Sequence, residues 1–192
     1  MRVTQVLQFR LVLEGIEPAV WRRIQVPTDF TLARLHRVVQ AVMGWQDYHL
    51  HQFTIAGRAY GVPDPQDEYE VTEERAVRLC DLQLSPGDRL NYLYDFGDDW
   101  HHVFELEQVL QSDVNDLMPR CLGGDCSTPP EDVGGAPGYE EFLRALEDPN
   151  HEEHAHMKSW VGRPFDPKRF SVEEANQRLR KSFRGRRAVN RS

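Results

Sequence analysis

DFTLARLHRVVQAVMGW, residues 29–45, is the stretch where apolar residues stop alternating and begin to repeat with the period of a helix. Thr31 is a natural N-cap, and Phe30 before it can pack on Leu35 as a hydrophobic staple. Gly44 is typical of a helix end. The stretch therefore predicts one helix, and its apolar stripe consists of Leu32, Leu35, Val38, Val39, Val42 and Met43.

Segments typical of strands flank this helix on both sides. Before it, residues 3–13 alternate apolar with polar side chains, and residues 20–26 continue the pattern after a turn, which predicts a hairpin. After it, residues 48–61 predict a third strand, and LNYLYDFGDDWHHVFELEQV, residues 90–109, predicts two strands joined by a tight turn. This order indicates an α+β protein with a mainly antiparallel sheet, a β-grasp-like core and C-terminal helices.

The whole chain is expected to form a single domain, because 192 residues are enough for one good core. The acidic stretch 62–74, with two prolines, predicts an exposed loop. One of the later helical segments is capped by Ser171, with Glu174 three residues on. The predicted parts of this domain, 1–192, are a sheet and helix core at 1–110, a Gly/Pro/Cys-rich loop at 111–137, a helical part at 138–185 and a basic tail at 186–192.

Basic residues are concentrated at the C-terminus. The last fifteen residues hold seven of the 23 Lys and Arg and no acid, which leaves 16 basic against 31 acidic groups, a net charge of −15, in residues 1–177. A body this acidic repels phosphate backbones. Nucleic-acid binding is therefore expected, if anywhere, through the basic tail.

The composition is that of a globular protein of the cytoplasm. No apolar run reaches the roughly 20 residues that a membrane span needs, and the first residues alternate instead of forming a signal-peptide block. Three cysteines are too few for a secreted disulfide scaffold and fit a reducing compartment. We therefore expect a cytoplasmic protein with no membrane partner.

Histidines and acids gather where the predicted strands begin and turn. His49 and His51 are two residues apart and share a face of the third strand with Phe53, while His102 shares its face with Phe104. If these strands are neighbours, the side chains meet at one rim of the sheet. The turn before His102 adds the polar or ligand-binding candidates Asp95, Asp98, Asp99 and Trp100.

This rim has two interpretations. Neutral imidazoles and carboxylates suit a divalent metal such as zinc or manganese, with His49, His51 and His102 as ligands. Alternatively, the same groups form a hydrogen-bonded polar cluster that fixes the hairpin without a metal. The polar cluster is the preferred interpretation, because no compact motif such as H-E-x-x-H is present.

A second candidate metal site uses Cys121 and Cys126, spaced C-x4-C, with the histidines of HEEHAH downstream. The alternative is a plain loop with two free thiols. Glu131 and Asp132 precede a predicted helix, and we expect them to cap a rigid turn or to join the ligand cluster.

Five motifs in order resemble the plasmid pRiA4b Orf-three-like family over about residues 3 to 180. They are MGWQDYHLHQFTI, LNYLYDFGDDWHH, PRCLGG, PPEDVGGAPGYEEFLRALEDPNHEEH and FDPKRFSVEEAN. Some members of that family are passengers of insertion elements and have a resolvase-type (TnpR-type) name. The resemblance itself implies no activity. Relatives commonly place the second cysteine directly before PPED, whereas Ser127 and Thr128 intervene here, which weakens the argument for a rigid cysteine spacing at a metal.

Three functions are consistent with these features. The first, which we favour, is a non-catalytic binding or accessory module linked to plasmids or mobile elements, with an unknown protein or small ligand as partner. The second is a metal-dependent enzyme of the hydrolase type that uses the His and Asp residues of the sheet rim. The third is a nucleic-acid-associated accessory protein acting through its basic tail. A serine recombinase is excluded, because residues 1–25 contain no serine to serve as the nucleophile.

Overall fold

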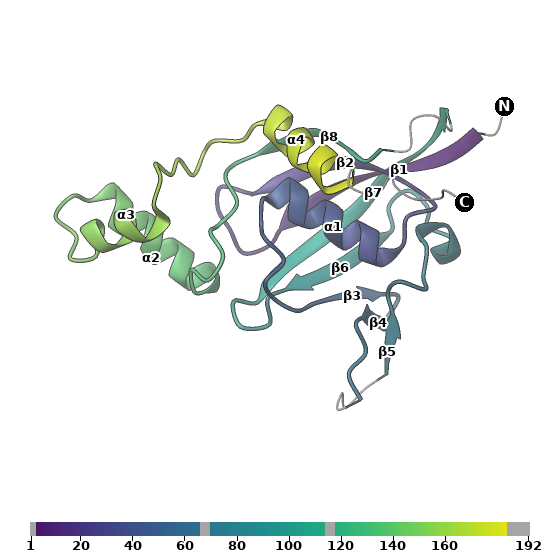
Figure 1. Ribbon diagram of the computed structural model, residues 1–192, viewed down its shortest axis with the longest axis horizontal. Helices are drawn as coiled ribbons and strands as arrows, with labels where there is room; N and C mark the ends of the chain where they lie inside the picture. The colour runs from purple at the N-terminus through teal and green to yellow at the C-terminus, as the bar shows by residue number, and fades with distance from the viewer. Residues whose placement is uncertain (1–2, 66–69, 114–117, 184–192) are drawn as a thin grey trace, which may run out of the picture.

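Eight strands form one sheet in the computed structural model, which describes residues 3–65, 70–113 and 118–183 (Figure 1). The strand order is β5-β4-β3-β6-β7-β1-β2-β8, and every pair except β4 with β5 is antiparallel. An α+β class with a mainly antiparallel sheet is therefore confirmed. The elements are β1 Val3–Leu13, β2 Trp21–Pro27, α1 Leu32–Met43, β3 His51–Ile55, β4 Arg58–Gly61, β5 Val71–Glu73, a 3-10 helix Leu79–Leu82, β6 Arg89–Tyr94, β7 Trp100–Asp113, β8 Arg120–Asp125, α2 Gly135–Glu147, α3 His154–Val161 and α4 Val172–Phe183.

The hairpin and helix that the first 45 residues predict are both present. β1 pairs with β2 so that Phe9 lies opposite Ile24, and both side chains are buried. The Thr31 hydroxyl accepts a hydrogen bond from the Arg34 N–H at the start of α1. Gly44 ends the helix in the left-handed conformation, at φ 86°.

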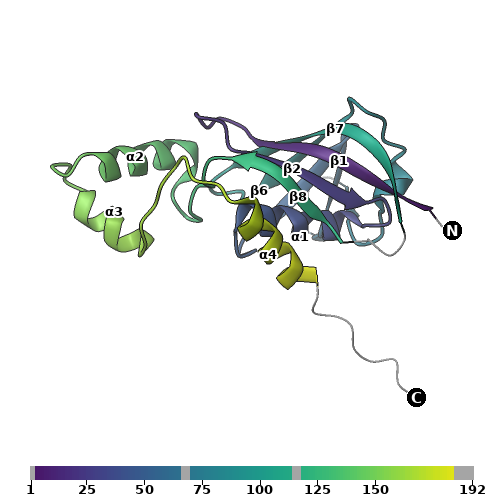
Figure 2. The ribbon, with the colours of Figure 1, turned by 90° about the horizontal axis from the view of Figure 1, so that it is seen from above.

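The sheet has one face covered by helices and one polar face. α1 and α4 lie side by side on the covered face, and α2 and α3 extend beyond one end of the sheet (Figures 1 and 2). On the polar face, the Glu107 carboxylate accepts hydrogen bonds from Arg23 at 2.7 Å and from Gln8 at 2.9 Å. Strands that bury only one face explain the alternation seen in the sequence.

Part of the predicted loop 111–137 is strand β8, which pairs with β2 at the edge of the sheet. The sequence of this strand has no alternating pattern. Hydrogen bonds from other elements stabilise the strand instead. The Asn176 side amide on α4 donates to the Cys121 carbonyl and accepts from the Cys121 N–H. The buried Arg22 guanidinium on β2 donates to the carbonyls of Asp125 and Cys126. These bonds cover a strand edge that the sequence alone does not reveal.

The helical region after residue 134 agrees with the prediction, except at its first cap. The Ser171 hydroxyl accepts from the Glu174 N–H as expected at the start of α4. α2 instead has Gly134 as its N-cap without a side-chain hydrogen bond, so neither Glu131 nor Asp132 caps this helix. The tail 186–192 lies outside the described residues. In the described part of the chain, no helix is long and apolar enough to cross a membrane.

Candidate functional site

Two groups of histidines and acids lie near the start of β3. The first, called the His36 cluster, consists of His36, Asp47, His51, Glu74 and Tyr92. His36 Nε2 is 2.8 Å from the Asp47 carboxylate, and its Nδ1 is 2.7 Å from the Tyr92 hydroxyl. His51 Nε2 is 2.9 Å from the Glu74 carboxylate. The cluster thus joins α1, β3, β6 and the segments that follow α1 and β5.

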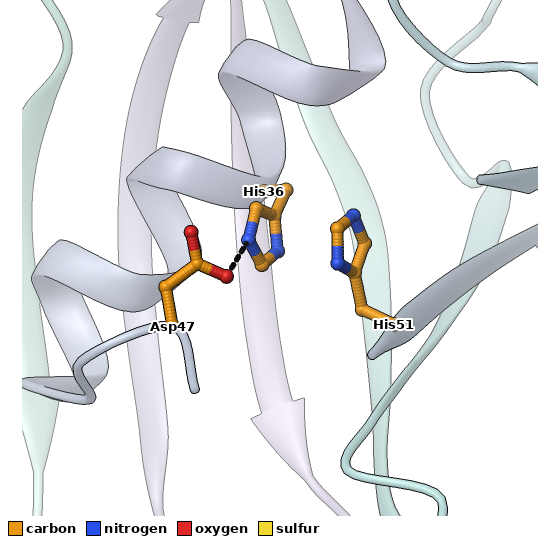
Figure 3. Close-up of side chains that lie close together, drawn as sticks. All are labelled: His36, Asp47 and His51. Atoms are coloured by element: carbon orange, nitrogen blue, oxygen red, sulfur yellow. Dashed lines mark hydrogen bonds and ion pairs between the residues drawn. The ribbon is translucent and has the colours of Figure 1, made fainter. Parts of the chain in front are cut away.

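The imidazoles of His36 and His51 are stacked face to face. Their ring centroids are 3.5 Å apart and their planes differ by 4°. Figure 3 shows the His36 ring between Asp47 and His51. A metal ion bound by an imidazole lies close to the ring plane, along the nitrogen lone pair. Two parallel, stacked planes share no such point, so in this arrangement the two rings do not bind one ion together.

Burial and hydrogen bonding shift the pKa values of three members of the His36 cluster. Burial lowers the pKa of His36, although the hydrogen bond to Asp47 acts in the opposite direction. The same hydrogen bond holds the pKa of the Asp47 carboxyl below its usual value. Burial raises the pKa of Tyr92 well above its usual value. We therefore assign an ionised Asp47, a neutral His36 that donates from Nε2, and a Tyr92 hydroxyl that donates to Nδ1.

The second group, called the His49 triad, consists of His49, Asp95 and Asp132. His49 lies just before β3, Asp95 follows β6, and Asp132 belongs to the segment between β8 and α2. His49 Nε2 is 3.1 Å from Asp132 Oδ1 and 3.5 Å from Asp95 Oδ2. Both distances are within ion-pair range, yet neither contact has the geometry of a hydrogen bond, and the nitrogen is shielded from solvent.

Hydrogen bonds from neighbouring residues hold the three segments of the triad together. Glu131 accepts from the Tyr94 hydroxyl and from the Gln46 N–H. The Asp98 carboxylate accepts from the Gly134 N–H at 3.1 Å. Thus Glu131 and Asp98 position the triad's loops on either side of Asp132 and are not themselves part of the triad.

Four members of the His36 cluster, together with His49 of the triad, border one cleft of about 500 Å³. His36, His51 and Glu74 are among the buried or half-buried residues of its lining. Three exposed apolar side chains also line it: Leu50 (67% exposed), Val62 (54%) and Phe96 (51%). A concave site of this size, with apolar walls and a few fixed polar groups, is typical of small-molecule sites.

The structure places the residues predicted at the sheet rim in several separate positions. His49 meets Asp95, as the rim predicts, while His51 points to the His36 cluster instead, because β3 begins only at His51 and the loop before it turns His49 away. Asp99 pairs with His101 on the surface, at 3.0 Å.

His102 and Trp100 lie in the core, which corrects their predicted place at the rim. The His102 ring packs against Trp45 and Tyr92, with centroids 5.4 Å away in each case, and its Nδ1 is 3.0 Å from the Trp100 carbonyl. Trp100 is only 2% exposed. The face that His102 shares with Phe104 was correctly predicted as apolar, and Trp45 covers that face at this end of the sheet.

The cysteines of the second predicted metal site are not gathered with histidines. Cys121 and Cys126 are buried and free, and burial raises the pKa of both thiols. His151 is 3.1 Å from Glu141, and His154 bonds to a backbone carbonyl. Within the described ranges, His and Asp donor atoms gather closely in two groups of three residues, and neither group contains a cysteine.

The sequence did not predict four members of the His36 cluster: His36, Asp47, Glu74 and Tyr92. His36 lies one helical turn after Leu32, so its spacing placed it on the buried stripe of α1, and that signal was available. Asp47 follows the helix end, and Glu74 ends a stretch predicted to be exposed. No local pattern distinguishes these two acids from solvated ones.

Comparisons with known proteins identify the family. Residues 5–174 match the family described as plasmid pRiA4b ORF-3-like protein. The chain belongs to this family. It is 39% identical, over 161 residues, to the uncharacterised protein y4hQ of Sinorhizobium fredii, with 83% of this chain and 82% of that protein covered. The fold also has a solved counterpart. The crystal structure of a protein of unknown function, MM3350 from Methanosarcina mazei Go1, is 36% identical and has a TM-score of 0.81, with 89% of this chain and 97% of that chain covered.

Proposed function

We propose that the protein is a non-catalytic binding module whose small ligand occupies the cleft beside the His36 cluster. The observation that carries this proposal is the contrast between the two parts of the cleft lining. Its deeper groups, His51 and Glu74, are already hydrogen bonded to each other and therefore hold a fixed arrangement. Its outer groups, Leu50 and Phe96, are apolar and exposed, which is costly in water unless a partner covers them.

A titration of the labelled protein with small aromatic fragments, followed by NMR, tests this proposal. We expect fragments to shift the signals of Leu50, Phe96 and His51. Leu50→Ala removes apolar contact worth roughly 1 kcal/mol, so fragment affinity is expected to fall about fivefold. Leu122→Ala is the matched control, because Leu122 is also an exposed leucine (45%) and lies on β8, outside the cleft lining. Equal affinity in the two variants, or shifts confined to other regions, contradicts the proposal.

A second candidate is a metal-dependent enzyme of the hydrolase type. One observation favours it: the His49 triad supplies three protein donors, and catalytic zinc sites commonly have three protein ligands and an open position. Zinc-dependent hydrolysis of p-nitrophenyl acetate or bis-p-nitrophenyl phosphate, lost in Asp132→Asn and kept in Leu122→Ala, supports the enzyme. No turnover by the zinc-loaded protein contradicts it.

Three further points are proposals of the same kind. An accessory role linked to plasmids or mobile elements is supported by the description of the family. A cytoplasmic location is supported by the free cysteines of the described residues. A β-grasp-like core is supported by the order of β1, β2, α1 and β3, in which a hairpin is followed by a helix across the sheet and then a further strand.

A further inference from the structure

The Nε2 atom of His49 is a buried polar atom without a hydrogen-bond partner. It is shielded from solvent, and no described residue satisfies it. Leaving a buried imidazole nitrogen unpartnered is unfavourable, and such atoms in native proteins commonly mark a missing water or ion. We propose that His49, Asp95 and Asp132 bind one divalent transition-metal ion, zinc or manganese, through His49 Nε2 and one carboxylate oxygen of each aspartate.

The two separations between His49 and the aspartates fit ligands of one ion, and all three donor atoms lie within 4.8 Å of one another. Two donors bound at about 2.0–2.2 Å to a common metal lie roughly 3.0–3.5 Å apart for octahedral to tetrahedral angles. The observed distances from His49 Nε2 are 3.1 Å to Asp132 and 3.5 Å to Asp95. Neither carboxylate oxygen is placed as a hydrogen-bond partner of His49 Nε2. This is expected of a metal site, because the cation occupies the lone-pair axis of Nε2 and the two oxygens lie beside that axis.

The Asp95 carboxylate is oriented before any ion binds. Its Oδ1 accepts hydrogen bonds from the N–H groups of Gly97, at 3.0 Å, and Asp98, at 3.2 Å. Its Oδ2 is left to face His49. Its backbone N–H also donates to the Leu50 carbonyl at 2.9 Å, which ties the ligand to the residue next to His49. Such outer hydrogen bonds orient ligands in known metal sites.

Asp132 is held in a backbone conformation that few residues adopt. Its φ is 60°, and Asp95 has a φ of 58°. The left-handed region is unfavourable for most residues, and such strain tends to collect at functional sites. The flanking residues Glu131 and Gly134 are anchored by the hydrogen bonds described above. Asp132 therefore reaches His49 from a segment that is fixed on both sides.

Charge and donor type indicate the class of ion. Two carboxylates balance the charge of one divalent cation, and one neutral imidazole with two oxygens suits zinc or manganese better than a thiolate-seeking ion. Three protein donors leave coordination positions for water or a ligand. His49 also lines the cleft, so a ligand in the cleft can approach these positions.

The test uses full-length protein purified without a polyhistidine tag and dialysed against zinc or manganese. We expect about one equivalent of metal in the wild type and at least tenfold weaker binding in Asp132→Asn, since Asn keeps the left-handed backbone but loses the charge. Asp99→Asn is the matched control: Asp99 is also an exposed aspartate in the left-handed conformation, at φ 59°, and lies outside the triad. We expect it to bind metal as the wild type does.

A second measurement locates the ion. Substoichiometric Mn²⁺ is expected to broaden the NMR signals of the His49 imidazole before those of His154, which lies on α3 outside the triad. The circular dichroism spectrum checks that each variant is folded. The proposal is overturned by a wild type that binds neither metal, by equal binding in Asp132→Asn and Asp99→Asn, or by broadening that begins at His36 or His51. Leu50→Ala, the variant that tests the proposed cleft ligand, is expected to bind metal as the wild type does. Failure of the metal proposal can therefore be distinguished from failure of the cleft-ligand proposal.

Discussion

His102 is a buried imidazole whose charge the fold does not tolerate. Burial lowers its pKa to about 3, and the hydrogen bond with the Trp100 carbonyl offsets only part of this effect. In the unfolded chain the pKa is about 6.5. Between these values the unfolded state binds more protons, so the free energy of unfolding falls as the pH drops from about 6.5, by up to about 1.4 kcal/mol per pH unit. Urea unfolding at pH 7, 6 and 5 gives the slope of the free energy of unfolding against pH. In His102→Phe this slope should be smaller than in the wild type by the equivalent of about one proton.

The neighbouring exposed imidazole provides the control for this experiment. His101→Gln leaves the buried ring in place and should keep the wild-type slope. His36, whose pKa is also lowered by burial, is expected to supply part of the slope that remains in His102→Phe. A wild-type slope in His102→Phe would refute the assignment of a neutral, buried His102.

Single residues also show how far the candidate site could be predicted. His49, Asp95 and Asp132 were all chosen from the sequence, because histidines at a strand start and acids in turns are types that gather at sheet rims. Their assembly into one triad was not predicted, since it depends on the segment after β8, about 35 residues further along the chain than Asp95. Contacts this distant leave no periodic pattern. Glu74 illustrates the same limit, because its burial follows from the pairing of β5 with β4.

At the scale of elements, β8 depends on a close approach that only glycine allows. A Cβ at Gly124 would lie 2.6 Å from the Trp21 carbonyl oxygen and 2.7 Å from the Phe170 ring. Gly124→Ala therefore forces the strand away from β2 and should destabilise the protein by roughly 1–3 kcal/mol. At the adjacent Gly123, a Cβ would meet only the Trp21 ring, at an ordinary 3.7 Å. Chemical denaturation of Gly123→Ala should show a change below about 1 kcal/mol, and similar losses in both variants would contradict this packing.

The same strand explains why its region was predicted as a loop. α1 and the β1–β2 hairpin follow from local periodicity, which was enough to predict them. β8 instead gets its stability from the Arg22 guanidinium and the Asn176 side amide, which come from elements far away in the chain. Glycine and cysteine in its sequence indicate a turn when considered locally.

For the whole molecule, charge separates the acidic residues 1–183 from the basic C-terminal residues 184–192, which include the predicted tail. Residues 184–192 carry four arginines and no acid, so a chain that ends at Phe183 has a net charge of −12 instead of −8. Phe183 is the right end point, because its ring stacks on Phe30 and the buried Leu179 precedes it. The truncated protein should keep the wild-type midpoint of urea unfolding and should not bind duplex DNA at 50 mM NaCl, since phosphate attraction supplies most non-specific affinity.

Full-length protein in the same titration measures the DNA affinity that residues 184–192 add. Four arginines limit the slope of log affinity against log salt to roughly −4. DNA binding that survives the truncation would place the nucleic-acid contact on the acidic body and refute this division.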